Sequence, residues 1–386
     1  MTSTNLICNY AELTVDRVPK AKNNKAEQHL MAFDQADVLA LDYVHEHGLV
    51  TAQTKILVIN DTYGALTCGM AKAAANHSGS APTLWSDSFI AHQALQLNGQ
   101  ANDLPPMNFV QAQDTPQGPF DLVLMRLPKS HTLLADQVAR LLPQLAPDAK
   151  LIMPVMVKHL DSPVYQLLES LFGAVTTSLA KKKARLVFAG MQQPKSNVSP
   201  APQATRWSAE EWGFDLHHYS GVFSRSRLDP GAQVLLQNFP QGPYNRVIDL
   251  GCGNGVQAIM AANKWSNAQV VGVDDSYMAI ASATINAQHN KVPDQCEFVA
   301  NDCLTGMVQG SADLILCNPP FHQERVVGDQ IAMRMFKQAA NVLDQDGELW
   351  VVGNRHLGYH AKLKRWFKRV EQVGAHPKFV VLKAQV

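Results

Sequence analysis

The segment Asn318-Pro319-Pro320-Phe321 carries groups that could act on a flat amine. The exocyclic amine of a nucleobase is a poor nucleophile, because its lone pair is delocalised into the ring. The side-chain oxygen of Asn318 and the main-chain carbonyl of Pro319 could accept both N–H bonds and aim the lone pair at an electrophile. Phe321 could stack on the base. An isolated segment of this kind is more often a proline turn that ends a strand, so its meaning depends on the residues around it.

A glycine-rich segment, Asp249-Leu-Gly-Cys-Gly-Asn-Gly255, lies upstream. Glycines between a strand and a helix allow a tight turn and a close approach of the backbone to a ligand. The spacing is GxGxG instead of the dinucleotide pattern GxGxxG, and a carboxylate beside the turn suits a cationic ligand better than a pyrophosphate. One alternative is a tight connection without a ligand. If a cofactor does bind, the candidate contacts are Asp249, Gly251, Gly253, Asn254 and Gly255.

Two further acids follow apolar runs. Asp274 comes about 20 residues after the glycine turn and is placed to accept hydrogen bonds from two ribose hydroxyls. A capping role is the competing interpretation, since Ser276 or Asp275 could cap a helix that starts at Tyr277; we expect Asp274 to bind ribose and Ser276 to cap. Asp302 could accept from the exocyclic amine of an adenine, although alone it would be an ordinary turn residue.

Apolar runs that alternate with helical stretches predict β–α–β units around a parallel sheet. We expect a buried strand over Arg246–Leu250, a helix from about Val256 and another strand in VVGVDDS. The apolar run that starts at Ser311 predicts a strand, and the prolines after it end that strand. Late strands are expected over Gly347–Gly353 and Lys378–Lys383.

The chain contains an internal repeat with a period of roughly 190 residues. KILVINDTYGALTC overlays RVIDLGCGNGVQA, and LWSDSFIAHQALQLNG overlays GVDDSYMAIASATINA. FDLVLMRLPKS overlays ADLILCNPPFH. The overlay pairs Gly64 with Gly255, Ser88 with Ser276, Asn98 with Asn286, Asp121 with Asp313 and Pro128 with Pro320.

The two copies differ where a cofactor could bind. Asn60, Thr62, Ser86 and Arg126-Leu127-Pro128 of the first copy stand where the second copy has Gly251, Gly253, Asp274 and Asn318-Pro319-Pro320. The apolar scaffold is kept. We therefore predict an α/β protein made by tandem duplication of Rossmann-like domains, in which the first is degenerate and the second active.

The segment Met191–Gln203 is rich in Pro, Ser, Asn and Gln, which is typical of a linker. It predicts a first domain over 1–195, a linker over 196–205 and a catalytic domain over 206–386. A length of 386 residues predicts two domains or three, and a hydrophobic share of 46% provides ample core.

The 33 basic and 33 acidic residues cancel, so any attraction to a polyanion must be local. The six cysteines include no CxxC pair, which argues against a zinc knuckle and a disulfide framework, and no metal is expected. No apolar run approaches the ~18 residues of a membrane span, and the predicted location is the cytoplasm.

Local basic groups are present. They either contact nucleic-acid phosphates or form solvated helix faces. The candidates are Arg225 and Arg227 ahead of the second copy, Arg355, Lys362, Lys364 and Arg365 near its end, and Lys181, Lys182 and Lys183 at the aligned end of the first copy.

The motifs DLGCGNG, VDDS, ND and NPPF, in this order, resemble those of class I S-adenosylmethionine-dependent methyltransferases that modify planar exocyclic nitrogens. A degenerate copy before an active one resembles the bacterial ribosomal RNA guanine-N2 methyltransferases. VFSRSRLDPGAQ, NPPFHQ and GNRHLGYHAKLKRWF most resemble the large-subunit (23S) enzymes among these.

This resemblance implies S-adenosylmethionine as methyl donor and a specific guanine N2 of 23S rRNA as acceptor. Because a guanine inside a stacked helix cannot reach the pocket, we expect naked or partly assembled RNA as the substrate and the first domain as an RNA platform. The positions that match the family's motifs are Gly251, Gly253, Asp274, Asp302 and Asn318.

Three alternatives remain open from the sequence. The acceptor could be a guanine of 16S rRNA. It could also be a protein glutamine or adenine N6, although enzymes of that kind usually carry Tyr or Trp where this chain has Phe321. A non-catalytic RNA-binding assembly protein on the same scaffold is the third. Intact Asp249, Asp274 and Asn318 argue against it for the second half, whereas that description could fit the first half.

Overall fold

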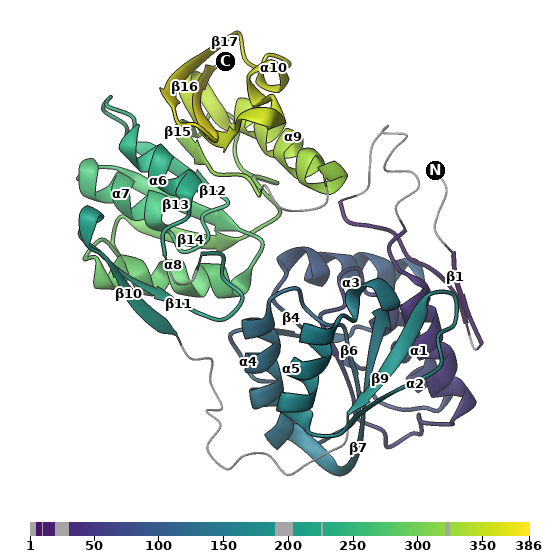
Figure 1. The fold of residues 1–386 in the computed structure, drawn as a ribbon. Coiled ribbons are helices and arrows are strands. Elements are labelled where there is room, and N and C mark those ends of the chain that lie inside the picture. The colour runs from purple at the N-terminus through teal and green to yellow at the C-terminus, as the bar shows by residue number, and fades with distance from the viewer. Residues whose placement is uncertain (1–4, 10, 20–30, 190–203, 225–226, 321–324) are drawn as a thin grey trace. The chain divides into compact units, whose positions relative to one another are not determined.

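The computed structural model describes residues 5–9, 11–19, 31–189, 204–224, 227–320 and 325–386, with the side chains of 325–328 left out. Contacts divide the chain into two compact units, Met1–Gln203 and Ala204–Val386 (Figure 1). Most of the segment predicted as a linker lies outside the described residues, and Thr205 already begins a strand. Among the described residues, no helix is both long and apolar enough to cross a membrane.

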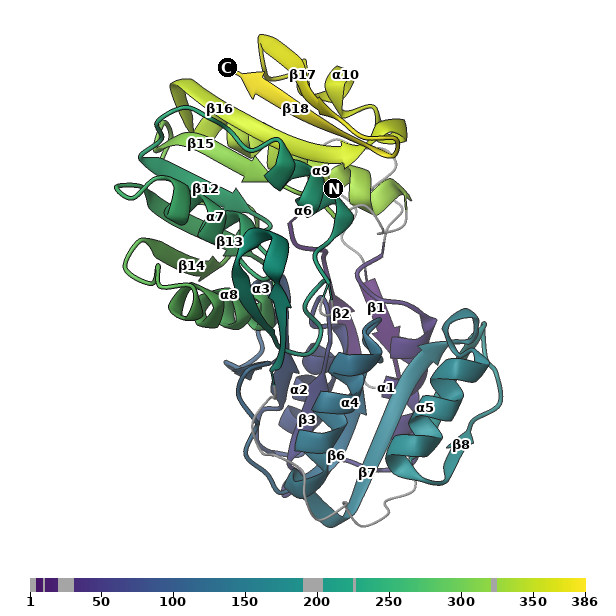
Figure 2. The same cartoon turned by 60° about the vertical axis from the view of Figure 1, so that its left-hand side comes forward.

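The second unit is built on a seven-stranded sheet of order β14-β13-β12-β15-β16-β18-β17, which Figure 2 shows from β14 upward. The strands from β14 to β16 run parallel, while β18 is antiparallel to β16 and β17. The strands are β12 (Arg246–Leu250), β13 (Gln269–Asp274), β14 (Cys296–Ala300), β15 (Ala312–Cys317), β16 (Leu343–Asn354), β17 (Arg369–Ala375) and β18 (Phe379–Gln385). The expected strands of the second copy are confirmed, and β17 was not expected.

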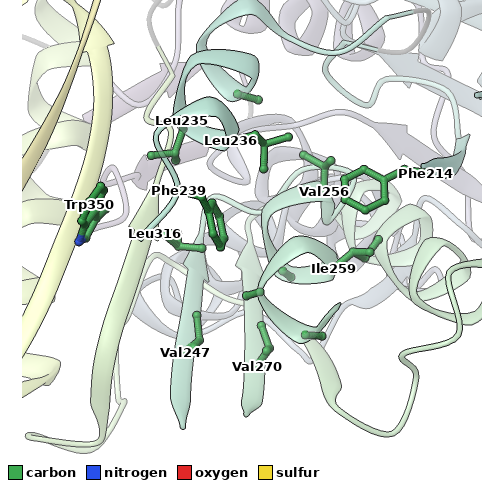
Figure 3. Packing of buried hydrophobic residues seen from close by; sticks show 14 of the residues in the cluster. Phe214, Leu235, Leu236, Phe239, Val247, Val256, Ile259, Val270, Leu316 and Trp350 are labelled. Carbon is green, nitrogen blue, oxygen red and sulfur yellow. The ribbon is translucent and has the colours of Figure 1, made fainter. Parts of the chain in front are cut away.

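Helices cover both faces of this sheet. Leu235 of α6 and Ile259 of α7 pack against Val247, Val270 and Leu316 of the strands on one face (Figure 3). Helices α9 and α10 contribute to a second apolar cluster on the other face. The helices are α6 (Pro230–Gln237), α7 (Val256–Lys264), α8 (Tyr277–His289), α9 (Arg325–Val342) and α10 (Tyr359–Leu363), with 3-10 turns over Glu210–Trp212 and Arg355–Leu357.

The first unit repeats this architecture with the sheet order β5-β4-β3-β6-β7-β9-β8. Its strands are β1 (Asn5–Cys8), β2 (Ala11–Thr14), β3 (Ile56–Ile59), β4 (Thr83–Ser86), β5 (Asn108–Gln111), β6 (Phe120–Met125), β7 (Leu145–Met156), β8 (Val175–Thr177) and β9 (Ala184–Ala189). Its helices are α1 (Gln35–Glu46), α2 (Ala65–Asn76), α3 (Phe89–Ala101), α4 (His131–Leu141) and α5 (Ser162–Phe172), with 3-10 turns over Leu142–Gln144 and Val157–His159.

A short antiparallel hairpin precedes each sheet: β1 with β2, and β10 (Thr205–Ala209) with β11 (Phe214–His218). Equivalent asparagines attach the two hairpins. Asn286 accepts from His217 N at 2.6 Å and donates to its carbonyl at 3.0 Å. Asn98 makes the same pair of bonds with Asp16, at 3.0 and 2.9 Å. The sequence overlay of Asn98 with Asn286 therefore reflects the same pair of side-chain hydrogen bonds to the backbone in both units, as a duplication predicts.

Candidate active site at the carboxyl ends of the second sheet

The glycine turn joins β12 to α7 with three residues in the left-handed region. Gly251, Gly253 and Gly255 have φ angles of +78°, +52° and +79°. A Cβ atom on Gly255 would lie 2.9 Å from the Cβ of Ala283, so the turn packs too closely on α8 for a side chain. A Cβ on Gly253 would meet no atom within 4 Å. The middle of the turn thus exposes bare backbone, which suits a ligand that must approach the main chain.

Asp249 is the penultimate residue of β12, two residues before Gly251, and is fully buried. Its Oδ2 accepts from Ala258 N at 3.0 Å. Its Oδ1 is buried and has no hydrogen-bond partner within the described part of the chain. Burial, and secondarily the charge of Asp274, raises the pKa of this carboxyl to about 7. A buried carboxylate oxygen without a partner fits a positively charged ligand, which would stabilise the ionised form.

Asp274, at the end of β13, ties the turn to the neighbouring strand. Its Oδ2 accepts from Gly253 N at 2.9 Å and its Oδ1 accepts from Ser276 N at 3.0 Å. Ser276 caps α8 by accepting from Ala279 N at 3.0 Å, so the expected cap is confirmed. Burial raises the pKa of Asp274. Each carboxylate oxygen retains a lone pair for a ribose hydroxyl, and that role remains a prediction.

Asp302 follows β14 and is bound by a residue that sequence reasoning missed. Arg334 of α9 donates to both of its oxygens, from Nη1 at 3.0 Å and from Nη2 to Oδ1. Asp302 is buried, and burial raises its pKa although Arg334 acts in the opposite direction. The guanidinium of Arg334 fixes the plane of the Asp302 carboxylate. The carboxylate oxygens still have lone pairs that can accept from a second donor, such as an adenine amine.

Asn318 follows β15, the strand next to β12. Its Nδ2 donates to Asp229 Oδ2 at 3.0 Å, a contact that sequence reasoning also missed. Its Oδ1 is buried and lacks a hydrogen-bond partner among the described residues. Pro319 is buried and Pro320 half-buried, whereas Phe321 lies outside the described residues. Asn318 Oδ1 is therefore a buried acceptor that a hydrogen-bond donor of a bound substrate could satisfy.

The basic candidates for RNA binding lie on the surface. Arg227, Arg355, Lys364, Arg365 and the three lysines Lys181, Lys182 and Lys183 are exposed, and Arg225 lies outside the described residues. Lys362 differs, because its ammonium donates to both oxygens of Asp329 at 2.8 Å. Its charge is therefore already partnered within the protein.

In the first unit, protein groups occupy the equivalent glycine-turn position. Asp61 is buried and accepts from Gly64 N at 3.1 Å and from both N and Oγ1 of Thr67 at 2.8 Å. Asn60 exchanges two hydrogen bonds with the amide of Gln137, at 2.8 and 2.9 Å. These polar groups satisfy one another, in agreement with a degenerate copy.

A group outside the proposed site could hold a metal ion. Ligand atoms of Asp215, His217 and His289 lie within 4.8 Å of one another, and the two imidazole rings stack with centroids 4.0 Å apart. Arg206 Nε already donates to Asp215 Oδ1 at 2.8 Å. None of these residues was singled out in the sequence.

Comparison with known proteins identifies both units. The Methyltransferase small domain family matches residues 213–383, and the RLMG N-terminal domain family matches residues 3–193. Proteins named ribosomal RNA large subunit methyltransferase G are 45% identical: that of Stutzerimonas stutzeri over 97% of both chains, and that of Pseudomonas aeruginosa over 97% of this chain and 98% of its own.

A solved structure supports the fold across both units. The T. thermophilus 16S rRNA N2 methyltransferase, solved in complex with AdoMet and guanosine, matches 100% of this chain and 98% of its own with a TM-score of 0.76 at 19% identity. The fold, the glycine turn and the family matches define the chain as an S-adenosylmethionine-dependent methyltransferase with two Rossmann-like units. More particularly, the chain belongs to the family of the ribosomal RNA large subunit methyltransferase G enzymes.

Proposed function

We propose that the protein methylates the exocyclic N2 amine of a specific guanine in 23S rRNA. The observation that carries this proposal is the buried, unpartnered Oδ1 of Asn318 at the end of β15, one strand away from the glycine turn. An oxygen in that position suits an amine donor. The name of the relatives supports the large ribosomal subunit as the source of the RNA.

S-adenosylmethionine supplies an electrophilic methyl group on a positively charged sulfur. The backbone of Gly251, Gly253, Asn254 and Gly255 would line its methionine part, with Asp249 facing its positive charge. Asp274 would accept from the ribose hydroxyls, and Asp302 from the adenine amine. This assignment is supported by the bare backbone at Gly253 and the unpartnered oxygen of Asp249.

The acceptor amine would be held by two carbonyl oxygens. Asn318 Oδ1 and the carbonyl of Pro319 accept its two N–H groups and direct the nitrogen lone pair to the methyl carbon, while Phe321 stacks on the guanine. The nitrogen would gain the methyl group as the bond from that methyl carbon to sulfur breaks and S-adenosylhomocysteine leaves. It would then release one proton to water, so no strong base is required. Positioning of the amine against the methyl group supplies most of the rate enhancement. For well-oriented groups it can lower the activation barrier by about 7–11 kcal/mol.

A guanine inside a stacked helix cannot enter such a site, so the target base must be flipped or unpaired at a cost of a few kcal/mol. Naked or partly opened RNA therefore suits the enzyme better than a finished subunit. The first unit would act as an RNA platform, with Lys181, Lys182 and Lys183 as phosphate contacts. In the second unit the contacts would be Arg225, Arg227, Arg355, Lys362, Lys364 and Arg365.

The test is the variant Asn318→Ala. It should bind S-adenosylmethionine within about twofold of the wild type and lose about 100-fold or more in methyl transfer to RNA, as when one polar group that stabilises a transition state is removed. Asn341→Ala, at an exposed position on α9, is the matched control and should transfer normally. Unchanged transfer by Asn318→Ala would remove the assigned role.

The acceptor is identified separately. Nucleoside mass spectrometry of rRNA from a strain that lacks the protein should show loss of N2-methylguanosine from one 23S fragment. Loss from 16S rRNA instead would overturn the proposed substrate. Methylation of adenine or of a protein glutamine by the purified enzyme, without guanine methylation, would overturn the reaction.

A further inference from the structure

We propose that Asp229 is a positioning residue that sets the orientation of the Asn318 side-chain amide and thereby makes the site an acceptor of amines. This inference rests on the proposed function. Asp229 precedes α6 and lies far from Asn318 in the sequence, but its Oδ2 accepts from Asn318 Nδ2 at 3.0 Å. Asp229 lies in the segment VFSRSRLDPGAQ, which was quoted above only for its family resemblance, and in none of the motifs considered for catalysis or cofactor binding.

Asp229 is held rigidly. Its side chain is buried, and its Oδ2 also accepts from Ala232 N at 2.9 Å as the N-cap of α6. Pro230 occupies the first position of that helix, where its fixed φ angle favours the helical start. Because the Asp229 carboxylate is hydrogen-bonded to the start of α6, it has little freedom to move. The side-chain amide of Asn318 must therefore orient itself to fit the carboxylate.

The chemistry of the two groups makes the contact selective. A carboxylate only accepts hydrogen bonds, whereas an amide donates from its nitrogen and accepts at its oxygen. Asp229 therefore requires the Nδ2 side of Asn318 and turns Oδ1 to the opposite side, where it is unpartnered within the described part of the chain. If the Asn318 amide were reversed, its Oδ1 would face the carboxylate oxygen of Asp229. Its NH2 group would then face the amine of the substrate, and two hydrogen-bond donors would oppose each other.

The first unit contains the same contact with a different partner. Asp34 caps α1, as Asp229 caps α6, and its carboxylate binds Arg126, the residue that the repeat aligns with Asn318. A link from the helix cap to the strand end is thus common to both copies. Arginine has no acceptor atom, so this link presents an acceptor oxygen in the second unit alone.

The variant Asp229→Asn tests the proposal. Asparagine is also a good N-cap, so α6 should be kept, but its amide can either accept from Asn318 or donate to it. The single-turnover rate of methyl transfer should fall by about 10- to 100-fold, which corresponds to a lost hydrogen bond to a charged group. The KM for RNA and the affinity for S-adenosylmethionine should change less than about threefold.

Asp161→Asn is the matched control. Asp161 caps α5 of the first unit by accepting from Val164 N at 3.1 Å, so the same chemical change occurs at a cap that has no strand-end partner in the described part of the chain. Its transfer rate should equal that of the wild type. Thermal unfolding of both variants shows whether each cap is kept, and Asp229→Ser provides a second capping variant that is too short to reach Asn318.

A double-mutant cycle separates positioning from general stability. In an Asn318→Ala background, Asp229→Asn should cause no further loss of rate, because there is no amide left to orient. If the fold-losses in rate of the two single variants multiplied in the double variant, the two residues would act independently and the proposal would be overturned. A wild-type rate in Asp229→Asn would also overturn it. In either case the wild-type enzyme would still methylate guanine, whereas a wild type without guanine methylation would refute the proposed function itself.

Discussion

Arg126 Nη1 and Nη2 donate to the two carboxylate oxygens of Asp34, at 3.1 and 2.9 Å, where the strand end of the first unit corresponds to that of Asn318 in the second. Nη1 also donates to the buried Asp37 at 2.8 Å. An ion pair in one unit thus occupies the position at which the other unit presents an acceptor oxygen. Under the proposed function, this difference accounts in physical terms for amine binding by the second unit and not by the first.

The first prediction concerns this ion pair. Arg126→Ala should lower the free energy of unfolding of the first unit by about 2 kcal/mol. This loss is smaller than the loss expected when a fully buried ion pair is broken, because Arg126 and Asp34 are partly exposed. Denaturant unfolding followed in the first unit measures the change. Lys129→Ala, at an exposed position, should stay within about 0.5 kcal/mol. An equal, small effect in both variants would mean that the ion pair contributes nothing to stability.

The pKa of Asp249 predicts a pH dependence. Burial raises this pKa to about 7, whereas an unfolded aspartate titrates near pH 4. Between these values the unfolded chain loses the proton that the folded chain keeps. The contribution of Asp249 to stability is therefore complete below about pH 4 and falls by up to about 1.4 kcal/mol per pH unit as the pH rises to about 7.

Asp249→Asn should remove this part of the slope in unfolding measured at pH 5, 6 and 7 without cofactor. Glu297→Gln, at an exposed position on β14, should keep the wild-type slope. If Asp249→Asn followed the wild-type curve, the raised pKa would be refuted.

The assignment of Asp302 to the adenine amine predicts discrimination between two product analogues. S-adenosylhomocysteine should bind about tenfold or more tightly than S-inosylhomocysteine, because the exocyclic carbonyl oxygen that replaces the adenine amine would face a carboxylate. Asp302→Asn should reduce this preference, because its amide can donate to that oxygen while still accepting from Arg334. Isothermal titration of both ligands gives the ratio, and Asp294→Asn serves as the exposed control. An unchanged ratio in Asp302→Asn would place the adenine elsewhere.

The surface lysines near α10 predict different salt dependences. Lys364 is exposed, and its replacement by alanine should lower the slope of log affinity for RNA against log salt by about 0.7 to 0.9. Lys362→Ala should lower it less, because Asp329 already binds the Lys362 ammonium at 2.8 Å. Filter binding between low and moderate salt measures both slopes. Slopes equal to that of the wild type in both variants would mean that this helix face is solvated and does not contact RNA.

Local patterns predicted much of the second unit. The strand Arg246–Leu250 and the helix from Val256 follow from a short apolar run and a glycine turn. Ser276 was predicted as a cap because a serine before a helical stretch satisfies free backbone N–H groups. The repeat transferred these predictions to the first unit. The strand β17 was missed because its residues show no regular alternation of apolar side chains. The hairpin of β10 and β11 was missed although Phe214 and Leu216 alternate with polar residues in the short β11.

The missed site contacts all join residues that are distant in the sequence. Arg334 reaches Asp302 from α9, and Asp229 reaches Asn318 from the start of α6. Such pairs depend on which elements become neighbours in the folded sheet, and one sequence contains no local trace of that. A weak signal existed for Asp229, because Asp-Pro-Gly before an apolar helix is typical of an N-cap, but it indicates only the cap.

The saturated strand ends of the first unit also bear on how the two copies diverged. Asp61 and Arg126 are each bound by several partners of their own unit, so a single substitution towards the second copy would break these bonds before it created any affinity for a methyl donor. Any path back towards the second copy would therefore begin with variants that have lost these hydrogen bonds or this ion pair.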